Sequence, residues 1–165
     1  MAQLLVLDEN MWPRLASVEL LGRGRTAIAL KHTELMGAGD PEVINTVAGW
    51  TDVVLVTNDD NMPSEHGQLL SRSGLTLAVV SPRSDRSFTL QAWERETVHR
   101  WAHLISNQPA GSLMRYTPFG HSAWRPRRRS AAGAARVAKT NRSMTTTVKP
   151  SAGLVTKEPE LSRLP

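Results

Sequence analysis

Short, continuous runs of apolar residues recur along the first 120 positions of the chain. Three stand out, at Leu4–Leu7, Val53–Val56 and Leu75–Val80, and a weaker fourth lies at Thr26–Leu30. Each run is uninterrupted rather than alternating, which is the pattern of strands covered on both faces in a parallel sheet. We therefore expect four buried strands, followed by a final short strand near Leu113–Tyr116.

Segments with apolar positions at helical spacing separate these runs and predict helices over Trp12–Leu21, Asp40–Gly49 and Phe88–Ile105. The second helix starts with Asp40-Pro41-Glu42, a strong start signal because Asp caps free amides and Pro suits the first turn. The alternation of strand and helix predicts an α/β domain with a mostly parallel sheet. The apolar stripe of the longest predicted helix consists of Leu90, Trp93, Thr97, Trp101, Leu104 and Ile105.

The charge of the chain is divided unevenly along its 165 residues, a length that suits about one domain. Lys and Arg number 20 against 15 Asp and Glu, but residues 1–120 hold 10 basic and 13 acidic residues, net −3. Residues 121–165 hold 10 basic and 2 acidic residues, net +8, and are rich in Ala, Ser and Thr. Such a composition is typical of disorder. We expect a globular domain over residues 1–120 and a disordered basic tail over 121–165.

The residue types that are missing narrow the chemistry. The chain has no cysteine, which excludes disulfides, zinc–thiolate sites and thiol nucleophiles. The first apolar run is only four residues long and continues into Asp8-Glu9, so we expect neither a signal peptide nor a membrane helix. The sequence therefore favours a soluble, cytoplasmic protein that uses oxygen or imidazole groups.

Carboxylates follow two of the predicted strands and begin one of the predicted helices. They are Asp8 and Glu9 after the first strand, Asp40 and Glu42 in the second helix, and Asp59 and Asp60 after the third strand. The carboxyl ends of parallel strands share one edge, where α/β proteins bind ligands. Carboxylates grouped there repel one another unless a cation lies between them, and oxygen ligands select Mg²⁺ or Mn²⁺. The pattern predicts metal-assisted hydrolysis of a phosphodiester.

Three motifs in this order carry a resemblance to a known family. Leu5–Asn10 reads Leu-Val-Leu-Asp-Glu-Asn, Gly37–Ile44 reads Gly-Ala-Gly-Asp-Pro-Glu-Val-Ile, and Val54–Met62 reads Val-Leu-Val-Thr-Asn-Asp-Asp-Asn-Met. The chain resembles the prokaryotic PIN-like proteins that open with an Asp-Glu-Asn motif, relatives of the VapC-type toxin ribonucleases. The resemblance spans residues 3–120 and is strongest over the first 62.

The resemblance implies a PIN-like α/β/α sandwich with Mg²⁺ or Mn²⁺, RNA as substrate, a cognate antitoxin and a homodimer. It implies Asp8, Asp40 and Asp59 as the metal-binding and catalytic residues. Glu9, Glu42, Thr57, Asp60 and Asn61 would be supporting or substitute ligands. The family commonly continues Asp-x-Asp-Phe where this chain has Asn61 and Met62, so one negative charge is missing.

Other interpretations of the same residues stay open. Asp8 and Asp40 could cap helices, and Asp59 and Asp60 could serve an Asn/Asp-rich turn. The loss of a carboxylate at Asn61 is compatible with a non-catalytic PIN-like module that binds RNA or a protein. A phosphatase-like enzyme is a weaker alternative, because its first strand would usually be followed by Asp-x-Asp. In the tail, Arg125, Arg127, Arg128 and Arg129 could contact RNA or simply keep the chain in solution.

Overall fold

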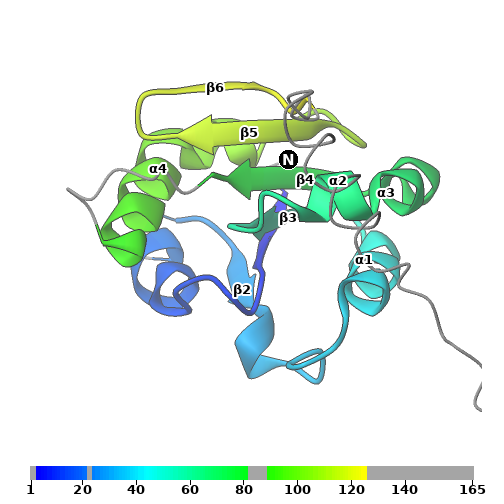
Figure 1. The fold of residues 1–165 in the computed structure, drawn as a ribbon. Helices are drawn as coiled ribbons and strands as arrows, with labels where there is room; N and C mark the ends of the chain where they lie inside the picture. The colour runs from blue at the N-terminus through cyan, green and yellow to red at the C-terminus, as the bar shows by residue number, and fades with distance from the viewer. Residues whose placement is uncertain (1–2, 22–23, 82–88, 126–165) are drawn as a thin grey trace, which may run out of the picture. The chain divides into compact units, whose positions relative to one another are not determined.

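The computed structural model describes residues 3–21, 24–81 and 89–125, which form one sheet with helices on both faces (Figure 1). The sheet has six strands in the order β2-β1-β3-β4-β5-β6, parallel except for the antiparallel pair β5–β6. The strands are β1 (Leu4–Leu7), β2 (Ala27–Ala29), β3 (Val53–Thr57), β4 (Thr76–Val80), β5 (Leu113–Thr117) and β6 (Gly120–Ala123). The prediction of an α/β fold with a mostly parallel sheet is confirmed.

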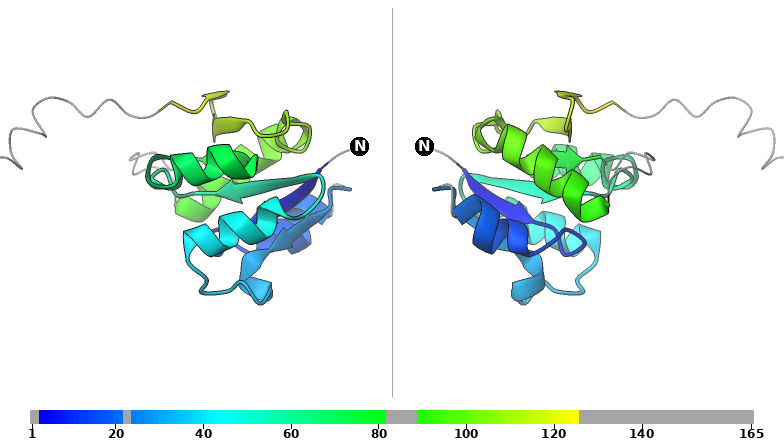
Figure 2. Two further views of the ribbon diagram at one scale, coloured as in Figure 1. Left: turned by 90° about the vertical axis from the view of Figure 1, so that its right-hand side faces the viewer. Right: turned by 90° about the vertical axis from the view of Figure 1, so that its left-hand side faces the viewer.

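Helices cover both faces of this sheet (Figure 2). The helical elements are η1 (Leu15–Leu20), η3 (Leu30–His32), α1 (Asp40–Ala48), α2 (Met62–Glu65), α3 (Gly67–Ser73) and α4 (Leu90–Ile105). Two apolar clusters fill the layers, one between the sheet and η1 with α4, the other between the sheet and α1 to α3.

Alternation along each strand explains why the apolar runs are continuous. In β1, Leu5 and Leu7 pack into the cluster with α4, whereas Val6 packs into the cluster with α1. In β4, Ala78 and Val80 join the first cluster while residues 77 and 79 join the second. Successive side chains point to opposite faces of a strand, so a sheet covered on both sides needs apolar residues at every position.

The helices differ from the sequence predictions at their ends. The expected helix over Trp12–Leu21 is a π-helix limited to Leu15–Leu20. The backbone N–H of Trp12, ahead of this helix, donates to a carboxylate of α4. Leu90 begins α4 but is 48% exposed, so it does not belong to the core as predicted.

The start of α1 also differs from expectation. Gly39 occupies the N-cap position, and Asp40 is the first helical residue, with Pro41 beside it in the first turn. The N-cap interpretation of Asp40 is therefore wrong, which leaves its carboxylate available for a tertiary contact.

The chain order places a topological switch point between β1 and β3. The chain moves from β1 to β2 on one side, then returns to lay β3, β4 and β5 on the other side of β1. In open α/β sheets ligands bind at the carboxyl ends of the strands beside such a reversal. This edge carries the residues directly after Leu7 and after Val56.

The compact unit continues to Pro126. The predicted domain end at residue 120 falls on the first residue of β6, and Trp124 packs against the second apolar cluster. Residues 121–125 therefore belong to the domain rather than to the tail. Residues 126–165, for which disorder was predicted, lie outside the described residues. The same holds for Arg127, Arg128 and Arg129. No helix among the described residues is long and apolar enough to cross a membrane.

Candidate functional site

Asp8 lies at the centre of the switch-point edge, directly after β1. Its side chain is 4% exposed, Oδ1 accepts a hydrogen bond from the backbone N–H of Glu9 (2.8 Å), and Oδ2 accepts one from the Thr57 hydroxyl (2.7 Å). The backbone N–H of Asp8 donates to the carbonyl of Val56 in the neighbouring strand (2.9 Å). Asp8 does not cap a helix, since the two hydrogen bonds of its carboxylate come from the adjacent residue and from Thr57 in β3.

Burial raises the pKa of the Asp8 carboxyl above its ordinary value. The hydrogen bonds from Thr57 and from the Glu9 backbone work in the opposite direction, and the negative charges of Asp40 and Glu9 raise the pKa further. The ionised form is therefore costly in the protein alone, and a positive charge next to Asp8 would stabilise it.

Thr57 connects Asp8 to the loop that follows β3. It is fully buried, and while its hydroxyl donates to Asp8, its Oγ1 also accepts the backbone N–H of Asp59 (3.0 Å). The Asp59 carboxylate then accepts the backbone N–H of Asn61 through Oδ1 (2.7 Å). The turn interpretation of Asp59 is confirmed by this bond, and Thr57 orients the loop through the backbone rather than through the carboxylate.

Asp40 contacts a histidine that the sequence did not indicate. Its Oδ2 lies 3.2 Å from Nε2 of His66, at the junction of α2 and α3, and both side chains are partly exposed. Asp40 also lies close enough to Asp8 to raise its pKa. Glu42, in the same helical turn, is exposed. The edge therefore brings the Asp8 and Asp40 carboxylates close enough for their negative charges to interact.

Glu9 fastens the loop that leads into α1. Its Oε2 accepts the backbone N–H of Gly37 (2.6 Å), a residue with a φ of 79°. This left-handed conformation favours glycine, so the Gly-Ala-Gly motif has a local structural cause. Glu9 thus supports the position of the Asp40 helix, the role of a supporting residue rather than of a central ligand.

Asp60 lies toward β4 and β5, where it contacts two residues that the sequence analysis did not identify. Its Oδ1 accepts a hydrogen bond from the Ser81 hydroxyl and lies 3.3 Å from Nη2 of Arg115. Since this carboxylate is paired with an arginine from β5, it is poorly placed to replace the charge that is missing at Asn61. Asn61 itself is exposed, at the N-terminus of α2.

Glu94 is the buried carboxylate that the sequence analysis missed entirely. It is 1% exposed, Oε2 accepts the backbone N–H of Trp12 (3.0 Å), and Oε1 accepts Nδ2 of Asn58 (2.6 Å). Burial raises its pKa, and these two hydrogen bonds oppose the rise. Asn58 also donates to the carbonyl of Asn10 (3.1 Å), so one network ties together the loops on either side of Asp8.

The acidic residues do not form a compact metal cluster. Among residues 3–21, 24–81 and 89–125, no three His, Asp or Glu side chains are close enough together to hold a metal ion. Asp8 and Asp40 interact, whereas Asp59 is engaged in its turn and Asp60 is paired with Arg115. This donor set suits a Mg²⁺ ion that keeps several waters and takes one or two carboxylates, and it does not suit a four-carboxylate site.

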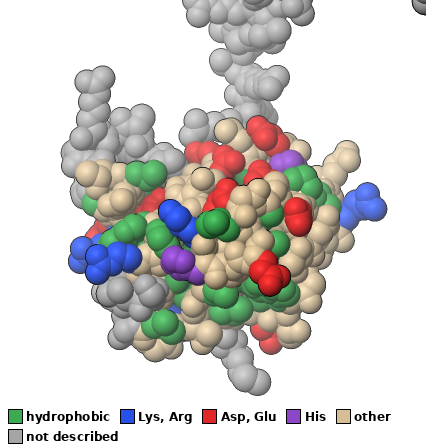
Figure 3. All heavy atoms as spheres, turned by 90° about the horizontal axis from the view of Figure 1, so that it is seen from below, with side chains coloured by type: hydrophobic (Ala, Val, Ile, Leu, Met, Phe, Trp, Pro, Cys, Tyr) green, Lys and Arg blue, Asp and Glu red, His purple; other side chains and the backbone are tan. Residues whose placement is uncertain are grey.

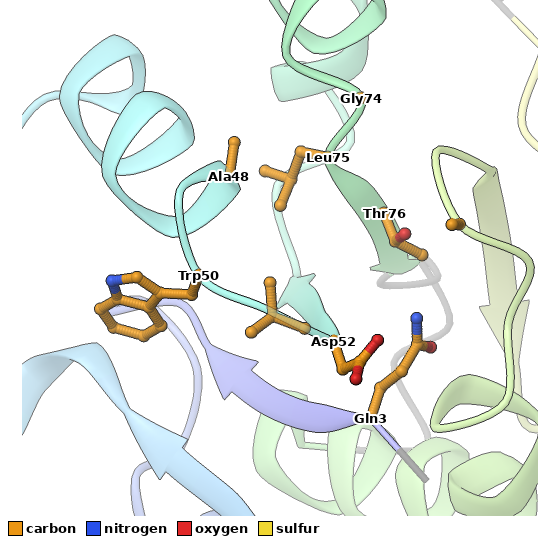
Figure 4. A pocket seen from close by; sticks show the side chains of 9 residues that line it. Gln3, Ala48, Trp50, Asp52, Gly74, Leu75 and Thr76 are labelled. Atoms are coloured by element: carbon orange, nitrogen blue, oxygen red, sulfur yellow. The ribbon is translucent and has the colours of Figure 1, made fainter. Parts of the chain in front are cut away.

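Several hollows open on the described surface, and His66, which contacts Asp40, lines one of about 590 Å³ over α2 and α3. Another, of about 120 Å³, lies at the amino ends of β3 and β4, where Gln3, Asp52 and Thr76 line it opposite Trp50 (Figure 4). It is at the opposite end of the strands from the acidic edge. Seen from below Figure 1, charged side chains of both signs are interspersed with hydrophobic ones on the described surface (Figure 3).

Comparison with protein-family models, with curated proteins and with solved structures finds no match for this chain. The likeness to PIN-like proteins therefore depends on the three sequence motifs alone.

Proposed function

We propose that the chain is a PIN-like, metal-dependent endoribonuclease acting in the cytoplasm as the toxin of a toxin–antitoxin pair. The observation that supports this most directly is Asp8, a buried carboxylate with a raised pKa at the switch point of a parallel sheet, beside Asp40. A buried anion with a second anion nearby is a typical position for a divalent cation. A cognate antitoxin and a homodimer are part of the proposal.

Asp8 and Asp40 would hold the cation, with Asp59 joining through the carboxylate oxygen that its turn does not use. Bound Mg²⁺ or Mn²⁺ supplies Lewis-acid activation of a phosphodiester and of water. Thr57 fixes the orientation of the Asp8 carboxylate through its hydroxyl (2.7 Å). The Glu9–Gly37 bond holds the segment before α1, which carries Asp40.

Cleavage of RNA by purified protein in Mg²⁺ tests the proposal. We expect Asp8→Asn to reduce the rate roughly 100-fold or more, the scale on which removing one electrostatic contributor to an active site acts. Asp52→Asn is the matched control, since Asp52 is an exposed carboxylate at the opposite end of the sheet, and Asn tolerates its φ of 52°. Equal rates for wild type and Asp8→Asn would exclude the proposal.

A second candidate function is a non-catalytic PIN-like module that binds RNA or a protein partner. The pairing of Asp60 with Arg115, next to the uncharged Asn61, favours it, because the edge then has fewer carboxylates for a metal. Calorimetric titration with Mg²⁺ separates the two. The nuclease should release or absorb heat in a saturable way that Asp8→Asn abolishes, whereas the module should give none.

A further inference from the structure

A hollow on the β5–β6 hairpin has no role in the proposed metal site. It encloses about 300 Å³ and is lined by Arg115, Ser122, Ala123 and Arg125. Arg115 in β5 pairs with Ser122 in β6, and the Trp124 backbone N–H donates to the carbonyl of Leu113 (2.9 Å), which extends the ladder by one residue. Arg115 and Ser122 thus lie opposite each other on the hairpin, and Arg125 follows β6 by two residues, so two arginines and a hydroxyl line one hollow.

The Arg115 side chain projects from the sheet face opposite α4. Met114 and Tyr116 pack into the cluster that contains α4, and alternation places Arg115 on the other face. Its Nη2 is 3.3 Å from Asp60, which fixes the guanidinium. Its Nε atom is buried and has no hydrogen-bond partner within the described part of the chain. A buried N–H without an acceptor is costly, and a ligand oxygen would satisfy it.

The charge balance of the hollow favours an anion. Arg115 and Arg125 supply two positive charges, whereas Asp60 neutralises only one of them. Guanidinium groups bind phosphate oxygens through several N–H donors in a fixed geometry, and a nearby hydroxyl adds another donor. Ser122 is exposed and lines the same hollow.

We propose that this hollow binds a backbone phosphate of single-stranded RNA, an inference that depends on the proposed function for the identity of the polymer. Asp60 links the hollow to the acidic edge, because it belongs to the loop after β3 and contacts Arg115. A strand held at Arg115 and Arg125 therefore lies beside the carboxyl ends of β3 and β4. The hollow offsets the repulsion between RNA and the acidic edge.

Titration of the full chain, followed by ¹H–¹⁵N NMR in EDTA, tests the proposal without any cleavage. The probes are inorganic phosphate, a 5′-phosphorylated uridine dinucleotide, and an unphosphorylated dinucleotide with an uncharged methylphosphonate linkage. We expect saturable shifts of the Arg115 Nε–H and the Ser122 amide with the first two probes only, and tighter binding of the dinucleotide. Arg125→Ala should weaken dinucleotide binding by roughly threefold to tenfold, the usual scale for a charge-assisted contact to phosphate.

Two further variants sharpen this test. Lys31→Ala removes an exposed cation at the other end of the sheet, beyond β2, and should change the affinity less than twofold. Asp60→Asn should tighten binding severalfold, because it removes the carboxylate that competes for Arg115.

Unchanged resonances at Arg115 and Ser122, or equal weakening by Arg125→Ala and Lys31→Ala, would overturn the proposal. Binding of inorganic phosphate without the dinucleotide would assign the hollow to free phosphate and reject RNA. Asp8→Asn should bind the dinucleotide as wild type does, so loss of catalysis and loss of this site are measured separately.

Discussion

At Asp8, burial in the folded protein disfavours the charged carboxylate that the proposed site requires. Asp8 follows the apolar strand β1 and is 4% exposed. Both of its carboxylate oxygens nevertheless accept hydrogen bonds, as those of an ionised group do. Burial, Asp40 and Glu9 all raise its pKa, so the ionised carboxylate is less favourable in the folded protein than in the unfolded chain. Buried charged residues in active sites often lower the free energy of unfolding, because they are kept for function.

Replacing Asp8 by Asn should stabilise the metal-free protein at pH 7 by about 1 kcal/mol, a common gain when a functional residue is neutralised. The amide keeps an acceptor for the Glu9 N–H and can donate to Thr57 Oγ1. A carboxyl with a raised folded-state pKa binds more protons in the folded state, so its stability contribution is present below the ordinary pKa of 3.8 and is lost as pH rises through the folded value. Urea unfolding in EDTA at pH 7 and at pH 3.5 measures both limits.

The gain should therefore be present at pH 7 and shrink toward zero at pH 3.5. Addition of Mg²⁺ should stabilise wild type and leave Asp8→Asn unchanged. A variant that is less stable than wild type at pH 7 would show that the ionised carboxylate contributes net stability through its hydrogen bonds.

At the scale of elements, Glu94 joins three segments that the sheet alone does not hold together. It lies in α4 and accepts two hydrogen bonds, one from the backbone N–H of Trp12 ahead of η1 and one from the side-chain amide of Asn58 after β3. Asn58 in turn reaches the carbonyl of Asn10, just past Asp8. Both loops that flank Asp8 therefore depend on one buried carboxylate.

Glu94→Gln should lower the free energy of unfolding by about 1–3 kcal/mol, because one carboxylate oxygen becomes an NH₂ that faces a donor and leaves it unsatisfied. Glu96→Gln is the matched control on the same helix; Glu96 is exposed, and its replacement should change stability by less than about 0.5 kcal/mol. Urea unfolding gives the free energies, and hydrogen exchange of the Trp12 amide should accelerate in Glu94→Gln alone. Equal stability of the two variants would contradict this role.

The elements also show why sequence predicts some parts of the fold and misses others. β1, β3 and β4 are uninterrupted apolar runs, and α1 and α4 have clear apolar faces, so their patterns are local. The helices α2 and α3 were not predicted, because each is short: Pro63 lies in the first turn of α2, Gly67 begins α3, and the segment offers too few turns for a clear apolar periodicity. The strand β6 has the sequence Gly-His-Ser-Ala, with no apolar alternation to indicate it.

In the candidate site, too, the sequence predicts what depends on local patterns and misses what depends on tertiary packing. The positions of Asp8, Asp40 and Asp59 at one edge follow from strand and helix boundaries, which local patterns predict. The partners of these residues come from distant segments: His66 pairs with Asp40, and Asn58 with Glu94. In the sequence Glu94 looks like its exposed neighbour Glu96, since only the packing of α4 against the loops distinguishes the two.

At the scale of the whole molecule, the charge is divided unevenly between the described domain and the segment that follows it in the sequence. Residues 1–125 contain 11 basic and 13 acidic residues, net −2, whereas residues 126–165 contain 9 basic and 2 acidic residues, net +7. The unit that ends at Pro126 contains every described strand and both apolar clusters. We therefore expect this unit to fold without the basic segment and to need the segment for full affinity toward a polyanion.

A chain that ends at Pro126 should keep the thermal midpoint of the full protein within a few degrees, because we expect its free energy of unfolding to change by less than about 1 kcal/mol. A change of that size shifts the midpoint by about 4–8 °C in domains of 60–100 residues and by somewhat less in a larger domain such as this one. Its affinity for single-stranded RNA should fall, and so should the slope of log K against log salt, by about 0.7 for each phosphate contact that is lost. Calorimetry measures the first quantity and fluorescence anisotropy in EDTA the second. A residual salt slope in the truncated chain is expected from Arg115 and Arg125, and Arg125→Ala in that background should remove part of it. A truncated chain that binds RNA with the same slope as the full protein would show that residues 127–165 make no phosphate contacts.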